Sequence, residues 1–298
     1  MEDECNSLLY MLSKDAQPDL QSFVMTESIN ISEFALQPLI QVSTNLTEIH
    51  TYSHWFDLNV LMNYKKLRIL RLHNATPFRN CSNEFLEACE KVFPSLENLE
   101  TSTICNTKLD GFDMHPLTTI ALAHCPKLTS VGSLDSAIAI GYIKSKIDES
   151  RTGYFGLKKC FWGIEAHWDI NDLSSAKYNY FKAIFPELIK TAVSCCPFVE
   201  ELHLQVLHKD CLQHLRGLKR LNFLYLQWPF CEDFEINECL SSLGEIRHQL
   251  KHFVIQRMDP FTRHLSFPLN VIFDKCENLE TLGNYILFSS QFAFENGS

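Results

Sequence analysis

The stretch that decides the fold is CPFVEELHL at residues 196–204. Its last six residues form an apolar phrase, L-x-x-L-x-L, in which Val199 stands in the first position. Clear copies start at Leu67, Leu221 and Leu250, and the same Cys-Pro pair precedes a further copy at Leu128. A phrase that returns at a period of a few tens of residues is typical of an array of stacked structural units.

The copies continue along the whole chain. Ten starts can be recognised, at Leu20, Leu46, Leu67, Leu96, Leu128, Leu157, Val199, Leu221, Leu250 and Leu279. Four of the nine gaps between them are 29 residues long. No linker or low-complexity stretch divides the sequence, so we predict a single array of about ten repeats over residues 1–298. Residues 1–19, with apolar positions at helical spacing, are expected to form an N-terminal capping helix.

The segments between the phrases have the apolar spacing of helices. In three of these segments the apolar side chains would lie on one face of a helix or all around it: residues 83–93, 115–124 and 237–249. Each unit is therefore expected to run strand, turn, helix and back to the next strand. Because no unit can bury its apolar face alone, neighbours must stack. The predicted fold is an α/β horseshoe, with a parallel sheet on the concave side and helices on the convex side.

The longest gap, 42 residues, separates the starts at Leu157 and Val199. Residues 172–184 have one helical pattern, and a second continues after Pro186. Proline inside a helix removes a hydrogen bond and clashes with the preceding turn. We therefore predict an inserted helical elaboration at residues 165–195, broken into two helices at Pro186.

Composition excludes several classes of function. The formal net charge is −10 and there is no run of Lys or Arg, so no nucleic-acid partner is expected. No stretch approaches the ~20 apolar residues of a membrane span. The 12 cysteines lie within apolar phrases, as reduced and buried thiols do. A cytoplasmic or nuclear protein is the resulting expectation.

No recognised catalytic or cofactor motif occurs in the sequence. His203, His208, Cys211 and His214 place four potential zinc ligands within twelve residues. However, His203 belongs to a predicted strand, while Cys211 and His214 belong to the helix that follows and face elsewhere. We therefore predict no metal site, no cofactor, no catalytic residues and no enzymatic activity.

The phrase Cys-Pro-x-Leu-x-x-Leu-x-Leu resembles the cysteine-containing leucine-rich repeats of F-box proteins, whose arrays are similar to the ribonuclease-inhibitor horseshoe. The resemblance covers roughly residues 20–287. It implies the substrate-recognition part of a cullin-based ubiquitin-ligase receptor. The F-box itself, a helical module that docks onto the ligase adaptor, is too large for residues 1–19. Cullin-ligase components are therefore expected as partners only if an F-box is supplied elsewhere. The alternatives are a stand-alone scaffold or inhibitor without a ligase link, and an enzyme with an unrecognised site.

The residues between the leucines of each phrase alternate with them and face the open side of the sheet. In the early repeats these positions are mostly polar: Glu48, His50, Arg71, His73, Asn98 and Glu100. The later repeats place these side chains there: Lys159, Phe161, Glu201, His203, Phe223, Tyr225, His252, Val254, Thr281 and Tyr285.

Aromatic side chains on an exposed patch are the usual anchors of protein interfaces. The predicted partner-binding residues on the concave face are Phe161, His203, Phe223, Tyr225, Val254 and Tyr285. A register slip of one residue would instead point all of them into the core.

Overall fold

The computed structural model describes residues 11, 19–25, 38–39, 41–51, 64–73, 95–102, 116–146, 154–163, 176–229, 235–258 and 269–286. The chain divides into two compact units, one of residues 1–139 with 165–167 and one of residues 140–164 with 168–298. Each unit contains five described strands, which pair in parallel and in chain order, and helices. The α/β class with parallel strands is thus confirmed, and the single array over residues 1–298 stays a prediction.

The first unit is built on strands β1 to β5. Their bounds are Ser22–Val24 for β1, Glu48–Thr51 for β2, Ile69–His73 for β3, Asn98–Ser102 for β4 and Ser130–Val131 for β5. Each strand pairs with the next in parallel. Helix α5 (Pro116–His124) lies within the predicted helical segment 115–124 and packs beside β4.

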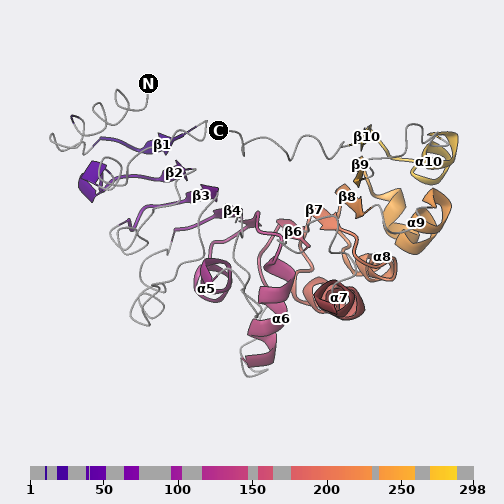
Figure 1. Ribbon diagram of the computed structural model, residues 1–298. Helices are drawn as coiled ribbons and strands as arrows, with labels where there is room; N and C mark the ends of the chain where they lie inside the picture. Colours follow the sequence, from indigo (N-terminus) through magenta and orange to yellow (C-terminus); the bar gives the residue numbers. More distant parts are fainter. Residues whose placement is uncertain are drawn as a thin grey trace, which may run out of the picture. The chain divides into compact units, whose positions relative to one another are not determined.

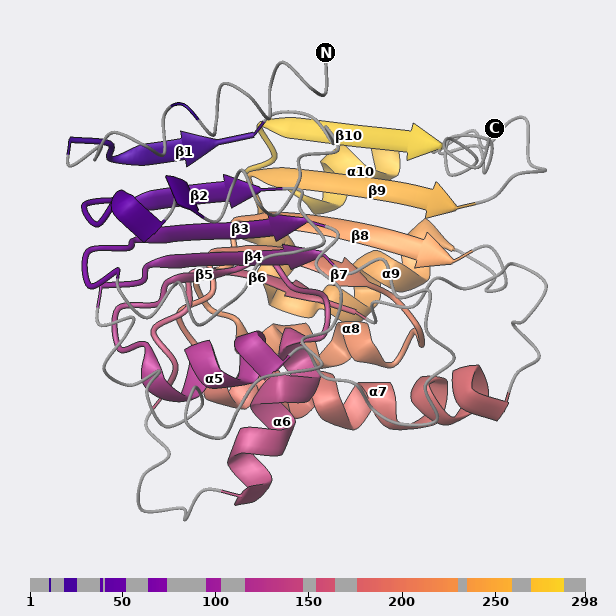
Figure 2. The same cartoon turned by 60° about the vertical axis from the view of Figure 1, so that its left-hand side comes forward.

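The second unit is built on strands β6 to β10, with helices along one side of them (Figures 1 and 2). The strands are β6 (Lys159–Trp162), β7 (Glu201–Gln205), β8 (Phe223–Pro229), β9 (His252–Met258) and β10 (Thr281–Ile286). The α-helices are α6 (Ser136–Lys146), which begins before the division between the units, α7 (Ala176–Cys195), α8 (Cys211–His214), α9 (Ile236–Leu243) and α10 (Leu269–Lys275). Two 3-10 helices, η3 (Leu215–Gly217) and η4 (Gly244–His248), follow α8 and α9. None of the helices in the described part of the chain combines the length and apolar character of a membrane span.

Every one of the ten strands begins two residues after one of the predicted starts. The first apolar residue of the phrase closes a tight turn, and the strand follows that turn. In three repeats its N–H donates to the carbonyl of a cysteine three residues earlier (Leu128 to Cys125, Val199 to Cys196 and Leu279 to Cys276). These cysteines are buried and form no disulfide, and burial explains the recurrence of a small apolar residue at the turn.

The core of the second unit follows the alternation of the phrase. Leu202, Leu224 and Phe253 are fully buried and lie opposite one another in register on β7, β8 and β9. Their neighbours along each strand are only partly buried. Since a slip of one residue would exchange these two sets, the burial pattern confirms the predicted register.

The predicted break at Pro186 is wrong. Helix α7 is one helix of 20 residues with Pro186 inside it. Phe181, Phe185 and Ile189 are buried on both sides of the proline, at the spacing of a single helical face. Burial of this continuous face compensates for the hydrogen bond that proline removes. The helix covers residues 176–195 of the predicted elaboration, and residues 165–175 lie outside the described part.

The predicted helix at 237–249 is present but divided. Helix α9 ends at Leu243, and the 3-10 helix η4 continues from Gly244 to His248. The φ angle of Gly244 is 58°, a backbone conformation that favours glycine. The Arg216 side chain fills the space beside Gly244 and donates two hydrogen bonds, to the carbonyls of Ser242 (2.9 Å) and Ser241 (3.1 Å). Arg216 thereby donates to carbonyls in the last turn of α9, among them that of Ser241, which also accepts from the Gly244 N–H.

Two sequence predictions fall on parts that the structure does not describe. The predicted helix at 83–93 lies wholly outside the described residues. Of the capping segment 1–19 only Met11, which is helical, and Asp19 are described. Both therefore stay predictions.

Candidate partner-binding face

An aromatic ladder crosses four neighbouring strands of the second unit. It consists of Phe161 on β6, His203 on β7, Phe223 and Tyr225 on β8, and His252 on β9. All five side chains occupy the positions that alternate with the buried core, and all five are partly exposed. The open face of β6 to β9 therefore presents rings where a solvated sheet would present polar side chains.

The rings of the ladder stack on one another because their strands pair in register. Phe161 lies opposite His203, and His203 lies opposite Tyr225. The ring centroids of Phe161 and His203 are 4.1 Å apart with the planes at 12°, and those of His203 and Tyr225 are 5.1 Å apart at 26°. Strand spacing in a sheet is about 4.8 Å, so side chains at equal register are at stacking distance.

Phe223 links the ladder to its last ring. Its centroid is 5.4 Å from that of His203 and 5.8 Å from that of His252. The His252 ring is also held by its Nδ1, which lies 2.7 Å from Thr281 Oγ1 on β10. A stacked aromatic pair contributes about 0.5–1.5 kcal/mol of stability in addition to the burial of its apolar area. These contacts hold the rings in place before a partner binds, so the ladder is a preorganised surface.

A single carboxylate, that of Glu201, lies within the ladder. Its Oε1 is 2.7 Å from Lys159 Nζ and 2.9 Å from His203 Nε2. Because an ionised carboxylate only accepts hydrogen bonds, Nε2 is the protonated nitrogen of His203. Burial opposes ionisation, but the hydrogen bonds from Lys159 and His203 outweigh it and hold the pKa of Glu201 below its ordinary value. Glu201 therefore stays charged at neutral pH and fixes the orientation of the His203 ring.

Four of the six predicted binding residues belong to the ladder: Phe161, His203, Phe223 and Tyr225. The other two are placed on the same face. Val254 lies opposite Tyr225 and is partly exposed. Tyr285 lies in β10 opposite Gln256, at a position of the same parity, and its side chain lies outside the described part. The structure adds His252, which strand parity placed on the open face but which we did not single out.

The corresponding positions of the first unit are mostly polar, as the sequence predicts, with Val24 opposite His50 as an apolar exception. Arg71 Nε lies 3.2 Å from Glu100 Oε2, and Ser22 donates a hydrogen bond of 3.0 Å to Glu48. Burial and the neighbouring Arg71 charge lower the pKa of His50 below its ordinary value, so neutral His50 is favoured at neutral pH. The aromatic character thus belongs to the second unit.

The histidine and cysteine cluster considered as a zinc site is separated by the fold. His203 is held by Glu201 on the open face, and His208 Nδ1 lies 3.5 Å from Asp210. Cys211 is buried, which raises the pKa of its thiol to about 12 and keeps it neutral. Among the described residues, the structure brings no three His, Cys, Asp or Glu side chains into position to bind one metal ion.

Neither a protein-family model nor a curated protein sequence matches the chain. The open face offers groups for non-covalent contact with another molecule. The ladder supplies partly exposed rings, and Glu201 with Lys159 supplies a fixed pair of opposite charges. These are groups that can bind and orient another molecule.

Proposed function

We propose that this chain is a non-catalytic protein-binding module of the leucine-rich-repeat type, which binds its partner on the open face of β6 to β9. The observation that carries the proposal is the aromatic ladder on that face. Aromatic side chains concentrate the binding energy of protein interfaces, and they do so where a preorganised cluster can be desolvated by the partner.

The size of the ladder favours a protein segment as the occupant. Four strands at about 4.8 Å spacing give a row of rings roughly 14 Å long. A row of this length offers a contact for several successive side chains of a partner. Charged side chains border the rings at the β6 and β7 end of the row, where Lys159 Nζ and Glu201 Oε1 form their 2.7 Å pair. Such an arrangement of central rings and polar edges resembles the core and rim of known interfaces.

The repeat geometry supports the leucine-rich-repeat form of the proposal. Ten strands follow ten phrases at the same offset, and buried cysteines occupy the turns before β5, β7 and β10. In such an array the helices take more room than the strands, so the sheet curves. We propose a horseshoe in which the open face is concave and the helices are convex.

The more specific form of the proposal is substrate recognition for an F-box-type ubiquitin ligase, with the F-box supplied by another segment or chain. Support for it comes from the Cys-Pro phrase. A reducing compartment, cytoplasm or nucleus, is part of the same proposal. It is supported by the seven described cysteines, Cys125, Cys196 and Cys276 among them, which are buried and form no disulfide.

The test is partner capture with two matched variants. Tyr225→Glu puts a charge at the centre of the ladder, and Tyr180→Glu puts the same charge on α7, where Tyr180 is 51% exposed. We expect proteins cross-linked to the wild type to be lost with Tyr225→Glu and retained with Tyr180→Glu, because burying an unpaired carboxylate at an interface is strongly unfavourable. Quantitative mass spectrometry of the cross-linked proteins is the measurement.

The same capture separates the two forms of the function. Cullin-ligase adaptor recovered together with the partner supports substrate recognition for a ligase. A stable partner recovered without any ligase component supports a stand-alone scaffold or inhibitor. Equal recovery of every protein with the wild type and with Tyr225→Glu would exclude the open face as the binding surface.

A further inference from the structure

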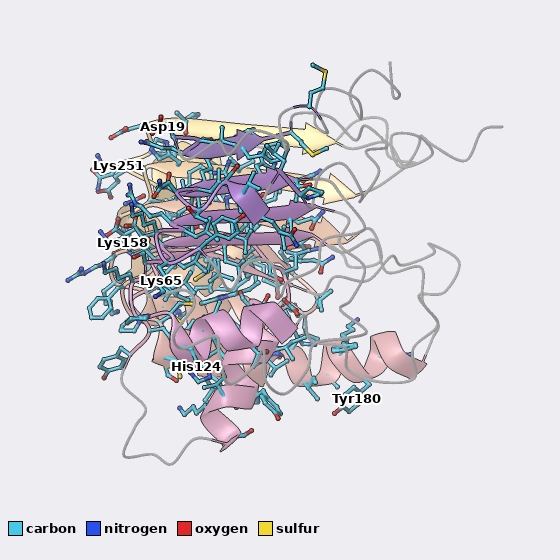
Figure 3. All side chains as sticks on the ribbon, turned by 90° about the vertical axis from the view of Figure 1, so that its left-hand side faces the viewer. Asp19, Lys65, His124, Lys158, Tyr180 and Lys251 are labelled. Carbon is cyan, nitrogen blue, oxygen red and sulfur yellow. The ribbon has the colours of Figure 1, made fainter. Side chains whose placement is uncertain are left out.

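A second cluster of exposed aromatic and basic side chains lies at the turns that enter β6, β7 and β8. It consists of Tyr154, Phe198, Lys219 and Arg220, which we name the turn-edge patch. Figure 3 marks this edge of the second unit by Lys158 and Lys251, which extend from it. None of the four residues belongs to the aromatic ladder.

The patch is an ordered arrangement and not a chance exposure of single side chains. The Tyr154 ring meets the Phe198 ring edge to face, with centroids 6.3 Å apart and planes at 82°. Arg220 Cζ lies 5.0 Å from the centroid of the Phe198 ring. Tyr154 is nevertheless 70% exposed, the largest exposed fraction among the described large apolar side chains. Tyr and Arg are the residue types that dominate the binding energy of protein interfaces.

Among the described residues that directly precede β6 to β10, the charged side chains form ion pairs with one another. The residues that directly precede the strands form a row in which each N–H donates to the carbonyl of the previous member: Lys158, Glu200, Asn222, Lys251 and Glu280. Lys158 pairs with Glu200 at 3.6 Å, and Lys251 pairs with Glu280 at 2.8 Å.

The middle place of that row holds Asn222, which has no charge. Arg220 and Lys219 stand next to it. In the described part of the chain, neither of these two cations lies within ion-pair distance of a carboxylate. Two positive charges without a described carboxylate partner therefore lie at one point of this edge, in a chain whose net charge is −10.

The contact between Arg220 and Phe198 determines what the patch can bind. A cation–π contact with a ring uses none of the N–H donors of a guanidinium as a hydrogen-bonding group, so these donors can bind another partner. Planar, paired donors match a carboxylate, which they bind through two parallel hydrogen bonds. Lys219 adds a second positive charge, and Tyr154 offers apolar area for a side chain beside the carboxylate.

From this charge complementarity we propose that the turn-edge patch binds an acidic protein segment, in which a Glu or Asp carboxylate pairs with Arg220 and a neighbouring apolar side chain packs on Tyr154. The patch shares no residue with the open face. An experiment can therefore distinguish a wrong assignment of the turn-edge patch from a wrong assignment of the open face.

The test uses the whole protein and a short fluorescein-labelled peptide with a Glu-Glu-Phe-Glu core, followed by fluorescence anisotropy. A matched peptide carries Gln-Gln-Phe-Gln. We expect the glutamate peptide to bind about tenfold more tightly, which is the effect of a charge-assisted hydrogen-bonded pair. Arg220→Ala is expected to remove this preference, and Tyr154→Ala is expected to weaken both peptides.

Two further variants make the result specific. Lys251→Ala removes a cation from the same edge that is already paired with Glu280, and it is expected to leave binding unchanged. Arg220→Lys keeps the charge but not the planar donors, and it is expected to retain only part of the preference. Equal binding of the two peptides, or unchanged binding by Arg220→Ala, would overturn the proposal. So would binding that requires phosphoserine in place of the glutamates.

Discussion

Replacing Phe253 by Ala is expected to lower the free energy of unfolding by about 3–5 kcal/mol. Phe253 is among the largest fully buried side chains, and it lies opposite Leu224 on β8 and Leu282 on β10. β8 pairs with β9 over its whole length and β10 pairs with all of it except Met258, so both strands have little freedom to close the cavity. Urea unfolding followed by circular dichroism measures the loss.

The adjacent residue provides the control for this prediction. Val254 is the next residue along β9 but points to the open face. Val254→Ala is expected to cost less than about 1 kcal/mol, since it removes contacts at a surface that solvent reaches. Equal losses from Phe253→Ala and Val254→Ala would mean that β9 does not separate a core face from an open face.

The double replacement of Phe223 and Tyr225 by Ala is expected to weaken binding of the captured partner about 100-fold or more. Truncation of one hot-spot aromatic typically costs about 2 kcal/mol or more of binding free energy, and a tenfold change in Kd corresponds to about 1.4 kcal/mol. Two such losses therefore exceed the roughly 2.8 kcal/mol of a 100-fold change. Both rings stack on His203, so the double variant also releases the ring that Glu201 orients. Isothermal titration of the purified partner measures the change in Kd.

The stability of the same variant shows whether the rings act at the surface or in the core. Loss of two stacked contacts is expected to lower the free energy of unfolding by about 1–3 kcal/mol. This is more than a solvated position would lose and less than a buried Phe would lose. Tyr142→Ala on α6 removes an exposed ring away from the ladder and is expected to change neither binding nor stability appreciably. Unchanged partner affinity in the Phe223 and Tyr225 variant would remove the ladder from the interface.

The strands could be predicted from sequence because each phrase carries its own register signal. A leucine at the turn and two more at alternating positions leave one arrangement in which all are buried. The same alternation places Phe161, His203 and Tyr225 on the open face without any knowledge of the structure. Even the degraded second copy, with Thr51 in the third apolar position, begins its strand at the predicted offset.

Other features depend on contacts between repeats, which the sequence of one repeat does not contain. The helix continues across Pro186 because Phe185 and Ile189 are buried against the unit. Helix propensity, which is a local property, does not predict that burial. The division of the 237–249 helix depends on Arg216, which stands beside Gly244 from an earlier repeat. Local pattern alone favours a break at Pro186 and an unbroken helix over residues 237–249, and the structure has the opposite in both places.

The geometry of the candidate sites was equally inaccessible from sequence. Phe161 and His203 are 42 residues apart, so their 4.1 Å stacking follows from the register of a repeat whose length is irregular. The link from Lys159 through Glu201 to His203 depends on the same register. Phe198 and Arg220 precede different strands, and only the pairing of those strands brings the ring and the guanidinium together.

Hydroxyl-radical footprinting of the protein with and without its captured partner tests the central claim most directly, because it reports the exposure of individual aromatic side chains. We predict that Phe161, Phe223 and Tyr225 become protected in the complex while Tyr142 and Tyr180 on the helices keep their reactivity. Protection of the helical tyrosines with an unchanged aromatic ladder would contradict the account.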